Sequence, residues 1–231
     1  MLLKRSEINR VISEALSFLE QRQIVFPSFA QWNLADWKNA GPEYQEIIDN
    51  MLGWDISDFG YGDYSKVGVL IFTFRNGNFH NKDKYPKPYA EKLLLVEANQ
   101  ELPFHFHWSK MEDIINRGGG NLIMQVYNAD DADGFADTDV HVAIDGRAVT
   151  LPAGGKITLR PGESITLLPR QYHRWMAEPG TGRVVLFEVS TINDDTIDNR
   201  FYDAKDRIPV IEEDEAPKYL IFDDYKRINN L

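Results

Sequence analysis

Three histidines and one glutamate have the residue types and the spacing of a metal site: His105, His107, Glu112 and His173. Side chains alternate between the two faces of a strand, so His105 and His107 point to the same side of one. Glu112 can return over them after a short turn, and the distant His173 completes the set. Imidazoles with a carboxylate suit manganese or iron(II), and they leave an octahedral ion two neighbouring positions for substrate oxygens. The alternative is a group of hydrogen-bonded histidines on a half-buried strand.

Short segments rich in β-branched and aromatic residues supply the framework for these side chains. Turn signals such as Asp145-Gly146 and Pro161-Gly162 separate the segments. About eight strands of this kind predict a mainly β sandwich or barrel with helices packed outside it. The predicted strands cover residues 67–74, 92–97, 104–108, 122–127, 140–144, 156–159, 164–168 and 183–190.

The two ends of the chain have different patterns. Residues 6–20 repeat apolar side chains at helical spacing after Ser6, the expected N-cap, and a second short helix is expected near 42–51. We expect an aromatic loop over 54–64 and an irregular acidic tail with a last strand near 219–222. The prediction is a single domain, 1–231. It divides into an N-terminal cap over 1–65, a barrel core over 66–192 and a C-terminal extension over 193–231.

Composition excludes several classes of protein. With 25 basic and 36 acidic residues the net charge is −11, so nucleic acid and anionic membranes are not expected partners. The absence of cysteine excludes disulfides and thiolate zinc sites and suits a reducing compartment. No apolar run is long enough for a membrane helix, and the N-terminus does not resemble a signal peptide. We therefore expect a cytoplasmic protein.

The ligand spacing resembles the two motifs of the cupin superfamily. Residues 105–119 are similar to the first motif, and Gly162, Pro169 and His173 are similar to the second. Asn99 stands where the first motif usually begins with glycine. The resemblance implies a β-sandwich jelly-roll barrel that holds the metal inside it.

A narrower resemblance extends over nearly the whole chain. The segments KLLLV at 92–96, HFHWSKMEDIINRGGG at 105–120 and DDTIDNRF at 194–201 are similar to bacterial D-lyxose isomerases. This family implies a manganese-dependent aldose–ketose isomerase that interconverts D-lyxose and D-xylulose. It also implies some action on D-mannose and D-fructose.

An isomerase of this kind moves a proton between C2 and C1 of the open-chain sugar, which requires acid–base residues near the metal. Lys110 is the first candidate because it lies between two predicted ligands, where a dication and burial are expected to lower its pKa. Asp206 is the second candidate, on the resemblance to the family. Lys92 and Arg207 are expected to bind the sugar. A hydride shift between the two carbons, which needs no base, remains an alternative.

Two other functions remain open at this stage. An iron-dependent cupin dioxygenase uses a similar ligand set, and a non-catalytic sugar-binding cupin needs no ligands at all. By analogy we also expect a homodimer, because exposed sheet edges are commonly covered by pairing.

Overall fold

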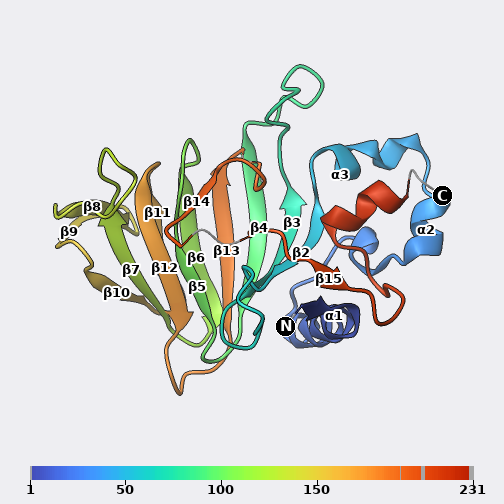
Figure 1. Cartoon of the computed structure of the whole chain (residues 1–231), viewed down its shortest axis with the longest axis horizontal. Coiled ribbons are helices and arrows are strands. Elements are labelled where there is room, and N and C mark those ends of the chain that lie inside the picture. Colours follow the sequence, from blue (N-terminus) through green and yellow to red (C-terminus); the bar gives the residue numbers. More distant parts are fainter. Residues whose placement is uncertain (1, 193, 204–205, 229–231) are drawn as a thin grey trace.

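The computed structural model describes residues 2–192, 194–203 and 206–228. It is mainly β, with two antiparallel sheets that face each other and helices that gather beside one end of the larger sheet (Figure 1). This arrangement confirms the predicted fold class. None of the described helices is long and apolar enough to cross a membrane.

The larger sheet has eight strands and the smaller one has five. The larger runs in the order β2 (Gly53–Ser57), β3 (Val69–Arg75), β4 (Tyr89–Val96), β13 (Val184–Thr191), β6 (Glu112–Gly119), β11 (Ser164–Leu167), β8 (Val140–Ile144) and β9 (Arg147–Leu151). The smaller runs in the order β10 (Lys156–Leu159), β7 (Leu122–Asn128), β12 (Gln171–Ala177), β5 (Glu101–His107) and β14 (Asn199–Phe201). A separate parallel pair joins β1 (Leu3–Lys4) to β15 (Ile211–Glu212).

Part of the larger sheet is buried on both faces. In β4, Leu94 and Val96 join the core between the two sheets, whereas Leu93 and Leu95 join a second core on the outer face. The helix α1 (Arg5–Glu20) covers that outer face with the apolar stripe predicted for residues 6–20. Burial on both faces explains why this strand is a continuous apolar run rather than an alternating one.

The helices confirm two predictions and correct one. A 3₁₀ turn, η2 (Pro42–Tyr44), and α3 (Gln45–Asp49) form the helix expected near 42–51. Ser6 is not an N-cap, because α1 begins at Arg5 and the Ser6 hydroxyl donates to Asp214 of the C-terminal segment. The remaining helical elements are η1 (Ser28–Gln31), α2 (Leu34–Lys38) and η3 (Phe222–Arg227).

Two further predictions were wrong. The expected aromatic loop over 54–64 begins as β2, an edge strand whose Trp54 and Ile56 pack in the outer core. The last strand expected near 219–222 is absent from the described residues. Ile221 there makes an isolated bridge to Trp54, and η3 follows at once. The described part of the C-terminal segment is irregular, as predicted, apart from β14, β15 and η3.

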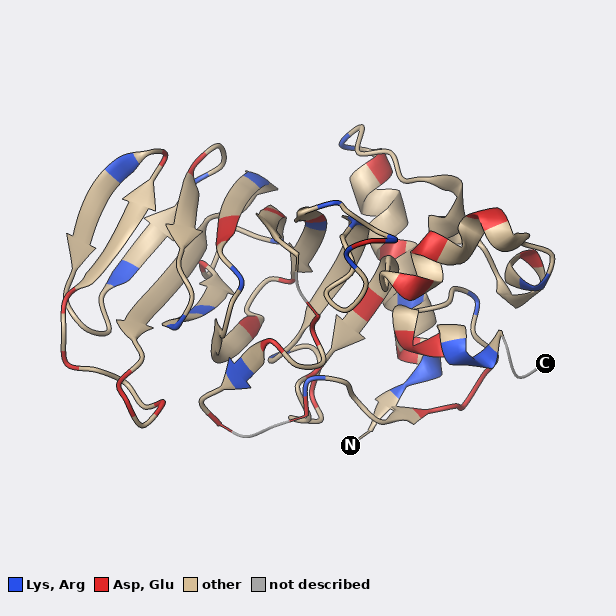
Figure 2. Ribbon diagram, turned by 90° about the horizontal axis from the view of Figure 1, so that it is seen from above, with Lys and Arg blue, Asp and Glu red and all other residues tan. Residues whose placement is uncertain are grey.

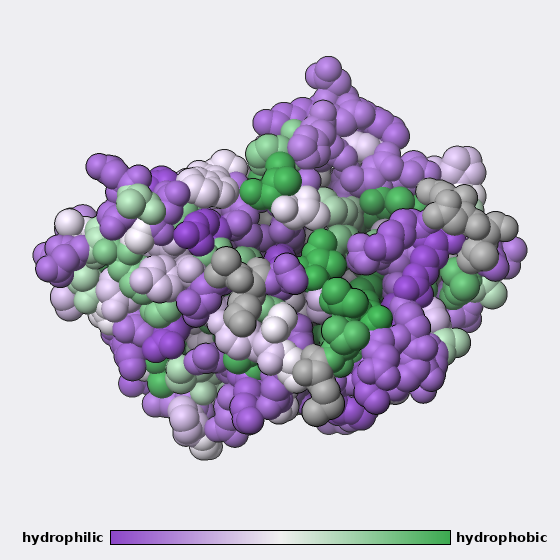
Figure 3. Space-filling model, viewed as in Figure 1, coloured by the Kyte–Doolittle hydropathy of each residue, from purple (hydrophilic) through white to green (hydrophobic). Residues whose placement is uncertain are grey.

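The surface agrees with the composition. Acidic residues recur along the helices and loops around the two termini (Figure 2). Hydrophilic side chains cover most of the face drawn in Figure 3, with an apolar area around β15. Val210, beside that strand, is 64% exposed.

Candidate active site

The facing sheets bring the predicted ligands together between them. His105 of β5 lies directly opposite His173 of β12 in the antiparallel register, and His107 follows two residues later on the same face. Ligand nitrogens of the three imidazoles lie within 4.8 Å of one another. Glu112, the first residue of β6, places its Oε1 3.1 Å from His173 Nε2 and 3.4 Å from His107 Nε2. All four side chains are buried.

Backbone contacts orient two of these rings. The Nδ1 atoms of His105 and His173 lie 3.0 Å from the carbonyl oxygens of Pro103 and Gln171. A ring that donates from Nδ1 keeps its Nε2 lone pair free for a metal, and such backbone contacts commonly fix metal-binding histidines. Burial lowers the pKa of His105 well below its usual range, and the neighbouring imidazoles add to this effect. The ring is therefore neutral at pH 7.

A divalent metal fits the unsatisfied atoms at the centre. Among the described residues, His107 Nε2, His173 Nε2 and Glu112 Oε1 are buried and have no hydrogen-bond partner. The short distances from Glu112 Oε1 to the two rings thus join atoms that lack hydrogen-bond geometry. Buried polar atoms without partners are rare, and convergent imidazole and carboxylate lone pairs are what a first-row metal binds.

Lys110 lies deep in the same site. Its Nζ is 2.6 Å from Glu112 Oε2 and donates to Glu188 Oε1 at 2.9 Å. The Asp198 carboxylate accepts the backbone N–H groups of Ser109 and Lys110, which fixes this turn against the C-terminal segment. Burial alone would lower the pKa of Lys110, but the carboxylates raise it. The carboxylates thus oppose the predicted lowering, which a bound dication would favour.

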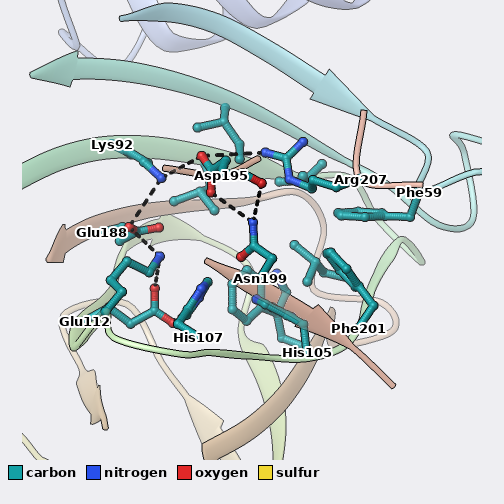
Figure 4. Close-up of a pocket in the computed structure, with 16 residues that line it drawn as sticks. Phe59, Lys92, His105, His107, Glu112, Glu188, Asp195, Asn199, Phe201 and Arg207 are labelled. Carbon is teal, nitrogen blue, oxygen red and sulfur yellow. Dashed lines mark hydrogen bonds and ion pairs between the residues drawn. The ribbon is translucent and has the colours of Figure 1, made fainter. Parts of the chain in front are cut away.

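A row of buried and half-buried charges continues beyond Glu188 through Lys92, Asp195 and Arg207 (Figure 4). Lys92 of β4 pairs with Glu188 in the strand register, and its Nζ lies 3.7 Å from that carboxylate and 3.0 Å from Asp195 Oδ2. Arg207 Nη2 lies 3.8 Å from the same Asp195 oxygen and also pairs with Asp55 of β2. Although burial raises the pKa of a carboxyl, Lys92 and Arg207 hold that of Asp195 well below its usual range. Charges alternate in sign along the row, so each buried ion has an opposite neighbour.

All of these groups except Asp55 line one cavity between the two sheets. The predicted residues Lys92, Lys110 and Arg207 are in its wall together with three of the predicted ligands, His105, His107 and Glu112, while His173 lies directly beside them. Asp206 does not line this cavity and is exposed. The rest of the wall is largely apolar and is formed by Phe59, Val69, Ile71, Leu94, Leu102, Trp175 and Phe201.

Sequence reasoning missed several polar residues of the cavity. Glu188 had a usable signal, because it is a lone acid inside an apolar strand, on the same face as Leu186. Lys92, which was identified, has that same signal in β4. Asp195 and Asn199 belong to a polar run without periodicity, and Asp55 belongs to a strand that was expected to be a loop. No local pattern marks these three.

Comparison with known proteins gives the family. The family model described as D-lyxose isomerase matches residues 3–225. The chain belongs to the D-lyxose isomerase family. A protein named D-lyxose/D-mannose isomerase from Serratia proteamaculans is 44% identical over 226 residues, 97% of this chain and 99% of that protein. A protein of the same name from Escherichia coli O157:H7 is 42% identical with the same coverage. This family member is therefore an aldose–ketose isomerase that acts on a small sugar.

Solved structures show the same fold at low sequence identity. An L-ribose isomerase from Acinetobacter sp. DL28, in complex with L-ribose, has a TM-score of 0.59 at 14% identity and covers 91% of this chain and 98% of its own. An L-ribose isomerase from Cellulomonas parahominis, with L-psicose, has a TM-score of 0.57 at 15% identity and covers 88% and 94%. This chain therefore shares its fold with solved L-ribose isomerases.

Proposed function

We propose that this protein interconverts D-lyxose and D-xylulose, and D-mannose and D-fructose, by moving a proton between C2 and C1 of the open-chain sugar. The relatives named D-lyxose/D-mannose isomerase support this choice of sugars. One observation gives the main support for proton transfer as the reaction. Lys110 bridges Glu112, a predicted metal ligand, and Glu188, a buried carboxylate in the same cavity. Groups that could carry protons and a predicted metal site thus line the same cavity.

We further propose that His105, His107, His173 and Glu112 hold a divalent first-row metal, with Mn²⁺ as the first choice. The convergent unsatisfied atoms support such a site, and a carboxylate among imidazoles favours harder ions such as manganese and iron(II). When bound, the ion supplies Lewis acidity that stabilises negative charge on the sugar oxygens. The remaining chemistry belongs to the protein side chains.

Glu188 is the proposed base at carbon. Its carboxylate takes the proton from C2 of the aldose and delivers a proton to C1 of the enediol, while Lys110 gives a proton to O1 and takes the one that O2 releases. Lys110 holds Glu188 in position and donates to the sugar oxygen on which charge develops. The exposed Asp206, our second candidate from the sequence, is outside the cavity and has no part in this scheme.

The rest of the charged row is proposed to bind the sugar hydroxyls. Lys92 and Arg207 keep the predicted role, and Asp195 joins them because it lies between the two and also lines the cavity. Two cations around one carboxylate provide donors and an acceptor for neighbouring hydroxyls.

The test is an activity screen on protein freed of metal and then loaded with Mn²⁺, Fe²⁺, Co²⁺ or Zn²⁺. We expect D-lyxose and D-mannose to be converted only by metal-loaded protein, and equally well without oxygen. Oxygen uptake with iron as the only active metal would indicate the dioxygenase. Sugar binding without turnover under any metal would indicate a binding protein.

We also propose that the enzyme works in the cytoplasm as a homodimer. The absence of cysteine suits a reducing compartment. Exposed apolar side chains, among them Trp108, Met111 and Val189, are the kind of surface that pairing covers. Light scattering on the purified protein measures the molecular mass in solution. A mass equal to that of one chain at micromolar concentration would contradict the dimer.

A further inference from the structure

Trp175 is a pocket residue that the proposed reaction does not use. It lies on β12 two residues after His173, so both side chains point to the same face of the strand. The indole stacks on the His173 ring, with centroids 5.6 Å apart and an angle of 14°, and its edge meets His105. Trp175 therefore forms the part of the cavity wall next to the predicted metal ligands.

The indole N–H of Trp175 has no partner. The side chain is 2% exposed, and within the described residues its Nε1 donates to no acceptor. Its strand neighbours in the register are Leu102 and Met124, which bring no side-chain oxygen. Trp54, the comparable buried tryptophan of the outer core, donates to the carbonyl oxygen of Ala30 at 2.7 Å. A buried indole normally has such a partner, so the Trp175 N–H is an exception that calls for a ligand.

We propose that the Trp175 N–H donates to one hydroxyl oxygen of the bound sugar and thereby selects for sugars that carry this hydroxyl. This inference rests on the proposed function. Lys92 and Glu188 project from the larger sheet, whereas Trp175 projects from the smaller one. An open-chain sugar has a hydroxyl or carbonyl on every carbon and needs partners on both sides. On the smaller-sheet side the imidazoles belong to the predicted metal site and Asn199 already donates to Asp195, so the indole N–H is the donor left for a sugar hydroxyl among the described residues. A site built around a donor rejects an analogue that lacks the acceptor.

The experiment compares Trp175→Phe with Trp54→Phe. Both substitutions remove an indole N–H and keep an aromatic ring. Each metal-loaded protein is titrated by calorimetry with D-arabinitol, the acyclic reduction product of D-lyxose, and its melting temperature is measured. We expect Trp175→Phe to weaken binding about 10-fold and to leave the melting temperature unchanged or raised, because it removes an unsatisfied donor. Trp54→Phe lowers the melting temperature and keeps the affinity, because it strands the Ala30 carbonyl.

Monodeoxy analogues of D-arabinitol then identify the partner. The analogue that lacks the selected hydroxyl should bind unmodified protein and Trp175→Phe equally well, while the other analogues keep the 10-fold difference. Equal D-arabinitol affinities for the two proteins, an equal loss for every analogue, or no binding to unmodified protein would overturn the inference. Trp175-dependent binding of D-arabinitol without any turnover of D-lyxose would overturn the proposed function alone.

Discussion

Two clusters of opposite charges, each with buried members at its centre, have different roles in this molecule. The terminal cluster joins the first helix to the C-terminal segment and consists of Arg5, Glu213 and Asp224. Arg5 is fully buried, and its guanidinium makes a two-pronged pair with each carboxylate at 2.8–3.0 Å. The donor fork matches the carboxylates in number and direction, so the terminal cluster is complete without a ligand.

The pocket cluster lies between the sheets and consists of Glu112, Lys110, Glu188, Lys92 and Asp195. It uses lysines, which are point charges without a fixed fork, and it faces a cavity rather than packed side chains. Beside it, His107 Nε2 and Glu112 Oε1 have no hydrogen-bond partner among the described residues. A charge cluster in which every polar atom has a partner indicates a structural role. A charge cluster beside buried polar atoms without hydrogen-bond partners indicates a ligand-binding site.

The largest expected effect follows from Glu112→Gln. An amide is a poor ligand for a divalent ion, so we expect the metal to be lost and kcat/KM for D-lyxose to fall by more than about 10⁴-fold. Metal content by mass spectrometry and a sugar assay measure both. Glu213→Gln, the matched change in the terminal cluster, should keep metal and activity. Full activity of Glu112→Gln would undo the assignment of the metal site.

Glu188→Gln separates proton transfer from metal binding. The substitution removes the proposed base at carbon and leaves the predicted ligands in place, so we expect kcat to fall about 10²–10⁴-fold with an unchanged metal content. Unchanged kcat would contradict the role of Glu188. A lowered metal content would show instead that Glu188 supports the ligands.

Disrupting the terminal cluster should lower the stability of the protein and leave its activity unchanged. Arg5→Leu removes the buried cation from the Asp224 carboxylate and leaves it only the longer, 3.5 Å pair with the exposed Arg227. We expect this to cost about 3–5 kcal/mol of unfolding free energy in urea. Because the cavity lies elsewhere, kcat at temperatures well below the transition should not change. An equal loss of kcat would mean that the two clusters are coupled through the C-terminal segment.

The smallest effect concerns acid stability. Hydrogen bonds from Arg5, with help from Arg227, outweigh burial and lower the pKa of Glu213 from 4.5 to about 2. A depressed carboxyl pKa stabilises the fold above pH 4.5, and this contribution disappears as the pH falls from 4.5 toward 2.

Since the Glu213 side chain is 35% exposed, solvent screening reduces its contribution to about 1–2 kcal/mol. Unfolding free energies of Glu213→Gln and the unmodified protein should therefore converge across this pH range. The neighbouring Glu212→Gln is the control, because Glu212 is 49% exposed and makes only a 3.7 Å pair with Lys4. A constant difference between Glu213→Gln and unmodified protein at all pH values would contradict the predicted pKa.

The comparison also shows what a sequence reveals. His105 and His107 share a strand face, so local periodicity alone predicts that their rings converge. A charge inside an apolar strand, such as Lys92 or Glu188, likewise reveals itself locally. Side chains from irregular segments cannot be placed from the local sequence, because their direction depends on contacts that form on folding. Asp195 reaches the cavity in this way, while Asp206 in the same segment stays at the surface.

The helices and strands, like the site residues, were predictable where local sequence determines them. The inner strands β3, β4, β7 and β13 were predictable from apolar runs. The inner strands β6 and β12 were not among the predicted strands, because polar side chains such as Asn116 and Arg174 interrupt their apolar pattern. The edge strand β2 was missed for the same reason, because its Asp55 and Ser57 face inward. Ser6 was assigned as a cap from local sequence, but its partner Asp214 lies 208 residues away. Long-range partners of this kind are invisible to local patterns.

Isomerisation of D-lyxose in D₂O by Mn²⁺-loaded protein is the most direct test of the proposed function. If Glu188 carries the proton between C2 and C1, solvent exchange places deuterium at C1 of the D-xylulose product, which NMR detects. D-Xylulose without deuterium would contradict proton transfer and favour a hydride shift. No D-xylulose at all, with any of the four metals, would contradict the assignment of this cavity to D-lyxose isomerisation.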